Sequence, residues 1–301
     1  MAHERRSPLE PAVSSPDLAF TAGFGFYLGL VAAGAVSVAA LVAGASTEAL
    51  LATAPGTVTA VLLAVLITGE RLRGIPEQIG RRRRSRAICY VPAAAFAAVL
   101  LVPAVGPLAY TARFAIVTIA LAALTAAAAV GVARMARNRY VEAVTVDEPA
   151  ATWTGHRTGF GSGEGAISAL MGVLVVVGLA GAVTNGWIGG VLVAVYGVAF
   201  LLGSRFDLWD DWDESDGRRN PPTFRAHQAG LVFERPYERR LLPWAAIEDV
   251  RLTADELVLE RDGLRFDIRC DRSAIDDPEA VLETIERTRK RAAGDTTELA
   301  H

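Results

Sequence analysis

The residues of this sequence most capable of chemistry are acidic and lie between 207 and 216, interleaved with two tryptophans. The carboxylates of Asp211, Asp213 and Asp216 are of a type that binds calcium. A calcium loop of the EF-hand type also needs a third ligand at position 5 and a closing Glu at position 12, and position 12 counted from Asp211 is Pro222. We therefore interpret the segment as a solvated acidic linker with tryptophans at the membrane interface.

A glycine-rich stretch at 159–165 superficially resembles a loop that cradles phosphate. It has neither the G-x-G-x-x-G spacing after a strand nor the Gly-Lys-Ser/Thr of a P-loop, and an apolar stretch follows it directly. We interpret it as a flexible linker. The four histidines, at 3, 156, 227 and 301, are too scattered to indicate a metal site. The sequence thus predicts no catalytic residue, no cofactor, no metal and no enzyme.

The densest positive charge is a cluster of five arginines within six positions: Arg81, Arg82, Arg83, Arg84 and Arg86. Beside a membrane, such side chains can hold anionic lipid head groups at about 1 kcal/mol each. Molar salt shortens the Debye length to about 3 Å and weakens that attraction. Membrane topology is the favoured role of the cluster, and contact with lipid head groups or a partner is the alternative. Nucleic acid is not expected, because no aromatic residues are interleaved.

Six apolar stretches precede and follow this cluster, at 18–45, 49–68, 87–110, 114–133, 167–183 and 187–203. Their lengths suit an α-helix, which needs about 20 residues to cross the hydrocarbon of a bilayer. None contains Asp, Glu, Lys, Arg or His. The sequence predicts an α-helical polytopic membrane bundle of six transmembrane helices over 18–203. Coupled transport is not expected, because it relies on ionisable groups inside the bilayer, but a passive pore or carrier remains open.

The arginines between the stretches predict the orientation, because cytoplasmic loops retain positive charge. The loops after the second and fourth stretches are rich in Arg, whereas 44–48 and 184–186 contain no Lys or Arg. With an even number of spans, both termini are expected in the cytoplasm of a protein of the cell (plasma) membrane, with 1–17 as the cytoplasmic N-terminus.

Two further patterns concern helix packing. Small residues recur four positions apart, at Gly25 and Gly29, Gly178 and Ala182, and Gly186 and Gly190. Such pairs let helices approach closely, and packing within the protein is favoured over a homo-oligomer in the membrane. Pro92, Pro103 and Pro107 predict that the third stretch is bent.

After the acidic linker at 204–218, short alternating segments replace the apolar bulk. Strands are expected at 223–227, 231–235, 239–242, 246–252, 256–261 and 264–270. Asp262-Gly263 predicts a tight hairpin between the last two. A helix is expected to start at Asp277-Pro278, where Asp277 can cap the first turn. The soluble domain is placed at 219–293 and a disordered tail at 294–301.

Several motifs of this region are similar to those of membrane-tethered pleckstrin-homology-like (PH-like) domain proteins of bacteria and archaea. They are Gly230-Leu231-Val232-Phe233, Leu241-Leu242-Pro243-Trp244 with Ile247 and Val250, and Leu257-Val258-Leu259 before a terminal helix. The resemblance covers about 165–292, including a transmembrane hairpin. It implies an antiparallel β-barrel or sandwich with one C-terminal helix, acting as a noncatalytic interaction module.

PH domains that bind lipid phosphate use a basic patch, for which Arg235, Arg239 and Arg240 are the candidates. Glu234 and Glu238 interleave with them, so contact with an unknown cytoplasmic protein or support against membrane lipids is expected rather than phosphoinositide binding. The segment 204–301 carries 23 acidic and 16 basic residues, and Lys290 is the one lysine of the chain. This composition resembles that of haloarchaeal proteins, although a high-GC bacterium would also explain the abundant Ala, Gly and Arg.

The leading hypothesis is therefore a membrane scaffold or adaptor that presents a cytoplasmic PH-like domain. The alternative is a passive transporter or channel that this domain regulates.

Overall fold

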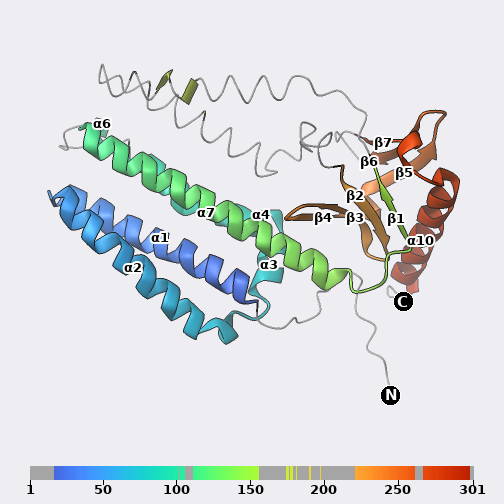
Figure 1. Cartoon of the computed structure of the whole chain (residues 1–301), viewed down its shortest axis with the longest axis horizontal. Coiled ribbons are helices and arrows are strands. Elements are labelled where there is room, and N and C mark those ends of the chain that lie inside the picture. Colours follow the sequence, from blue (N-terminus) through green and yellow to red (C-terminus); the bar gives the residue numbers. More distant parts are fainter. Residues whose placement is uncertain are drawn as a thin grey trace. The chain divides into compact units, whose positions relative to one another are not determined.

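The computed structural model describes residues 17–100, 102–105, 111–155, 221–261 and 267–298, together with isolated positions between 174 and 197 (Figure 1). The chain forms two compact units. One contains the apolar helices up to Ala136, and the other contains the C-terminal strands together with residues from Arg137 onward. The acidic linker, the glycine-rich stretch and almost all of the predicted spans at 167–183 and 187–203 lie outside the described residues.

Three helices are long and apolar enough to cross a membrane: α1 (Leu18–Val42), α2 (Thr47–Ile67) and α7 (Ala112–Val144). They confirm the helices predicted at 18–45, 49–68 and 114–133. Helix α7 is longer than predicted, and its 33 residues extend about 50 Å at 1.5 Å per residue. This is longer than the hydrocarbon core of a bilayer, which is about 30 Å thick.

The third predicted span is not one helix. The chain forms η1 (Gly69–Leu72), α3 (Ile75–Arg81), α4 (Arg83–Ile88), α5 (Val91–Val99) and α6 (Val102–Val105). Pro92 lies in the first turn of α5 and Pro103 lies in α6. Proline lacks the amide proton that an uninterrupted helix requires, which accounts for breaks in this region. The prediction of six transmembrane helices is thus not supported, since the described residues contain three helices of membrane-spanning length.

Close backbone contact joins α1 to α2. A Cβ atom on Gly29 would lie 2.9 Å from the carbonyl oxygen of Val58, and one on Gly25 would lie 3.1 Å from side-chain atoms of Leu62 and Val65. Only glycine permits this approach without a shift of one helix. The first pair of small residues therefore packs within the protein, as the favoured interpretation predicted.

The segment of short helices from α4 to α6, which we call the broken segment, runs alongside α7 in the opposite direction. At its start, Cys89 packs in one apolar cluster with Val132 of α7 and Tyr27 of α1, and the Tyr27 hydroxyl donates to the Cys89 carbonyl at 2.8 Å. At the end of α5, Leu100 packs against Phe114 and Ala115 at the other end of α7. The segment therefore follows α7 from its C-terminal half to its N-terminal end.

The C-terminal unit contains two antiparallel sheets. The first has the order β1 (Ala151–Thr154), β2 (Thr223–His227), β3 (Gly230–Arg235) and β4 (Glu238–Pro243). The second has the order β5 (Ile247–Leu252), β6 (Glu256–Arg261) and β7 (Ile268–Asp271). Strands β2 to β6 confirm the strands predicted at these positions to within a few residues. Strand β7 matches the end of the strand predicted at 264–270, whose first residues lie outside the described range, as does the predicted Asp262-Gly263 turn. In the described part of the chain the two sheets are separate and do not form a closed barrel.

One apolar core joins both sheets and the final helix, α10 (Pro278–Glu298). Leu231 of the first sheet, Leu259 of the second and Ile285 of α10 are each at most 1% exposed. The Asp277 carboxylate accepts the amide proton of Ala280 at 3.0 Å, which confirms the predicted cap. The helix continues through Glu298.

Strand β1 was not predicted, and it lies far from the other strands in the sequence. It pairs with β2, where Trp153 is opposite Phe224 and the two rings stack with centroids 5.4 Å apart. Just beyond this pair, the amide of Gly155 donates to the carbonyl of Pro222 at 3.2 Å. The sandwich is therefore assembled from two chain segments. The ends of the 66 residues between Gly155 and Pro222 lie next to each other.

This assembly predicts which fragments fold. Residues 219–301 alone lack β1 and the Trp153 ring, and losing a buried aromatic side chain costs about 3–5 kcal/mol out of a typical total of about 5–15 kcal/mol. We expect this fragment to unfold or aggregate. Residues 137–155 joined to 222–301 by a two-residue Asn-Gly turn should instead fold as a soluble sandwich. Thermal melting followed by circular dichroism distinguishes the two, and equal melting temperatures would contradict a structural role for β1.

Candidate functional site

The arginine cluster predicted near the membrane lies at the break between α3 and α4. Arg82 lies between the two helices, after Arg81 and before Arg83. The side chains from Arg81 to Arg84 are exposed. Arg86 is partly buried, and its guanidinium donates to the Gly80 carbonyl at 2.5 Å. Four of the five arginine side chains are thus exposed. This arrangement suits both topology determination and contact with head groups, and each stays a prediction.

The other three predicted contact residues lie together on the β3–β4 hairpin, but each has a partner there. Arg239 Nε lies 3.0 Å from Glu234 Oε1, and Arg240 Nε lies 2.7 Å from Glu238 Oε1. The Arg235 guanidinium lies 5.2 Å from the centre of the Phe233 ring, a cation–π distance. The interleaved glutamates therefore bind two of the three arginines that would have formed a phosphate-binding patch, and the third contacts an aromatic ring.

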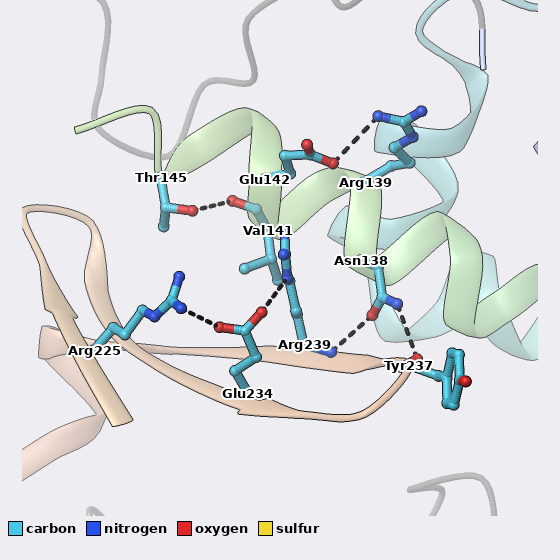
Figure 2. A network of polar contacts seen from close by, with 9 residues as sticks. All are labelled: Asn138, Arg139, Val141, Glu142, Thr145, Arg225, Glu234, Tyr237 and Arg239. Carbon is cyan, nitrogen blue, oxygen red and sulfur yellow. Dashed lines mark hydrogen bonds and ion pairs between the residues drawn. The ribbon is translucent and has the colours of Figure 1, made fainter. Parts of the chain in front are cut away.

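The hairpin is joined to the end of α7 by a set of polar contacts that we call the α7–hairpin junction. Figure 2 shows that Asn138 of α7 points at the hairpin backbone. Its Nδ2 donates to the carbonyl of Tyr237 at 3.0 Å, and its Oδ1 accepts the amide proton of Arg239 at 2.8 Å. Because β4 is an edge strand, its outer backbone groups need a partner or cover. One asparagine side chain supplies both a donor and an acceptor.

Ion pairs reinforce this junction. Arg137 Nη2, one residue before Asn138, lies 2.6 Å from Glu238 Oε1, and both side chains are only 12% exposed. The same oxygen accepts from Arg240, so one carboxylate lies between two guanidinium groups. Glu234 similarly lies between Arg239 and Arg225, the latter at 3.1 Å (Figure 2). Removing one member of a buried pair leaves an uncompensated charge and is strongly destabilising.

A second attachment follows within ten residues of the first. Asp147 Oδ2 accepts the amide proton of Gln228 at 2.9 Å, and Asp147 Oδ1 lies 3.3 Å from His227 Nδ1. The carbonyl of His227 in turn accepts from Trp244 Nε1 at 2.9 Å. The chain leaving α7 is therefore tied to the β2–β3 turn before it enters β1.

Tyr237, at the tip of the hairpin, combines strain with exposure. Its φ angle of 66° is positive, which no other described residue except glycine shows, and this left-handed conformation costs a side-chain-bearing residue about 1–2 kcal/mol. The side chain is nevertheless 93% exposed. Pro236 signals the turn in the sequence, but nothing in the sequence indicates that Asn138 holds its backbone. Sequence reasoning missed both residues.

Where the structure is described, no group of three or more His, Cys, Asp or Glu side chains is placed to hold a metal ion. The junction consists of guanidinium, carboxylate and amide groups in fixed pairs, an arrangement that fastens a helix end to a sheet edge. No protein-family model, curated protein or solved structure matches the chain.

The junction predicts a specific loss of stability. In Asn138→Ala, the amide of Arg239 and the carbonyl of Tyr237 lose their partner, which costs about 1–3 kcal/mol. We expect a lower melting temperature and faster hydrogen exchange at the Arg239 amide.

Glu142→Ala is the matched control, because it removes an exposed contact to Arg139 at 3.2 Å from the same helix end. Exposed pairs of this kind contribute about 0–1 kcal/mol. Equal effects of the two substitutions on the Arg239 amide would show that Asn138 does not secure the hairpin.

Proposed function

We propose that the protein is an integral membrane scaffold or adaptor that presents a noncatalytic PH-like domain at the cytoplasmic surface. The α7–hairpin junction is the observation that carries the proposal. Helix α7 begins as an apolar segment of membrane-spanning length and ends within the soluble sandwich, to which Arg137 and Asn138 attach it. A domain fastened in this way is displayed on a membrane helix instead of hanging from a flexible linker.

The order of the sandwich supports the PH-like part of the proposal. Four antiparallel strands and then three form two sheets, and one helix follows and packs on their common core. The order from β2 to α10 is consistent with the resemblance, which implies binding of a protein or of the membrane surface, whereas β1 lies outside the residues that the resemblance covers. A haloarchaeal origin stays a prediction.

We further propose that the chain crosses the membrane six times. The broken segment from α4 to α6 follows α7 in the opposite direction, which supports a fourth crossing beside α1, α2 and α7. Because Gly155 and Pro222 are hydrogen-bonded to each other, the residues between them must return to the side they left, so they cross an even number of times. Two apolar stretches, 167–183 and 187–203, supply one such pair. The Arg-rich loops support a cytoplasmic position for both termini.

This topology predicts opposite labelling at two positions. In a variant without Cys89 and Cys270, a cysteine at Asn185 should react with a membrane-impermeant maleimide only from outside the cell. A cysteine at Arg82 should react only after the membrane is opened, because its loop is cytoplasmic. Reaction at both positions from the same side would contradict the proposed order of crossings.

The alternative function, a passive transporter or channel regulated by the sandwich, also has an observation in its favour. Thr118 and Thr125 lie seven residues apart on α7, are 0% and 1% exposed, and their hydroxyls have no hydrogen-bond partner in the described part of the chain. The neighbouring segment of the same unit is a broken helix, and broken helices form the substrate sites of many transporters.

The two functions predict different results with the full chain. An adaptor should retain a cytoplasmic protein when it is purified from membranes in high salt, and excess soluble sandwich, built as residues 137–155 joined to 222–301, should displace that protein. A matched sandwich with Leu257→Asp, which puts a charge at a position 0% exposed, should unfold and displace nothing. Failure of the intact sandwich to compete would contradict the adaptor. Flux of ions or small solutes through vesicles containing the pure protein would instead establish the transporter.

A further inference from the structure

The tip of the β3–β4 hairpin carries a side chain that neither the fold nor the junction requires. Tyr237 adopts the one positive φ angle found at a described residue other than glycine, yet its side chain is 93% exposed and contributes almost nothing to the core. A glycine would adopt this backbone conformation without strain. Strained residues that persist on a well-held backbone indicate a functional role for the side chain, and here Asn138 holds the backbone.

The position of the tip relative to the membrane follows from α7 itself. The apolar part of this helix ends at Ala133, and Arg134 is the first charged residue after it. Asn138 lies five residues beyond Ala133, which is about 7.5 Å along the helix axis. The head-group layer on each side of a bilayer is about 5–8 Å thick. Because α7 continues as one helix from Ala133 to Asn138, a residue hydrogen-bonded to Asn138 lies within reach of the head groups if α7 crosses the membrane.

The chemistry of the tip suits that layer. Tyrosine has an apolar ring and a polar hydroxyl, and it is enriched where membrane meets water. A soluble partner would have no reason to depend on the distance from the end of an apolar helix, whereas a lipid surface does.

We propose that Pro236 and Tyr237 are seated in the head-group layer of the membrane, with the Tyr237 ring as an interfacial anchor for the soluble sandwich. The inference rests on the proposed membrane crossing of α7. The anchor and the junction together hold the hairpin at two points, one on the helix and one on the lipid, and this limits rotation of the sandwich about α7.

The test uses the full chain in vesicles of phosphatidylcholine and phosphatidylglycerol at a ratio of 3:1. In a background with Cys89→Ala and Cys270→Ala, a fluorescent NBD label is attached through Tyr237→Cys or, as the matched control, through Glu283→Cys. Glu283 has a side chain 73% exposed and belongs to α10, which lies across the sandwich from the hairpin tip (Figure 1).

At position 237 we expect blue-shifted emission, strong quenching by lipids that carry a nitroxide on the head group, and at least threefold weaker quenching by iodide than at position 283. Equal iodide quenching at both positions would show that the tip lies in water and would overturn the anchor. Protection from iodide without nitroxide quenching would show that protein covers the tip, which also overturns it. Neither result affects maleimide labelling at 82 and 185, so failure of the anchor is distinguishable from failure of the topology.

Discussion

The ion pair between Arg137 and Glu238 joins two kinds of structure that have opposite requirements. Most of α7 is apolar and suits hydrocarbon, whereas the sandwich has charged outer faces and needs water. Where they meet, a helix end must lie against an edge strand, and both present backbone or charged groups that cannot be left without partners. Glu238 between two guanidinium groups and Asn138 between a carbonyl and an amide satisfy these groups together. The attachment of the sandwich to the end of the long apolar helix α7 depends on this small set of contacts.

The same constraint explains why the sandwich is built from separate parts of the chain. Once α7 ends against the hairpin, Asp147 and then β1 continue along the first sheet, and Trp153 covers Phe224. The following 66 residues leave after Gly155 and return at Pro222. A long excursion between two paired strands adds little closure entropy, since that cost rises only with the logarithm of loop length. The sheet therefore tolerates an insertion of 66 residues between two of its strands.

In the helical unit, α1 and α2 are held together by close backbone contact, whereas polar contacts hold the sandwich to the end of α7. Gly29 lies against the backbone of Val58, and a methyl group would not fit between them. Apolar side chains gain little by leaving lipid for one another, so van der Waals contact at short range is what favours association of such helices. The breaks around α5 fit the same scheme, because a kinked segment can still follow α7 through Cys89 at one end and Leu100 at the other.

Much of this architecture follows from sequence alone, because its signals are local. Apolar length predicts α1, α2 and α7, alternation of apolar and charged residues predicts β2 to β7, and Asp277-Pro278 predicts the start of α10. Proline predicts where the third stretch bends, but not that it divides into separate short helices. Strand β1 has only four residues, too few for alternation to be distinguished from chance, and it becomes a strand only because β2 is available to pair with it. The roles of Asn138 and Tyr237 depend on contacts across about 100 positions of the chain, and no local pattern records them. Sequence thus determined which segments suit lipid and which suit water, because hydrophobicity and backbone preference are local properties. Only the tertiary structure decided how the two kinds of segment are joined, because the joining depends on hydrogen bonds and ion pairs between residues far apart in the chain.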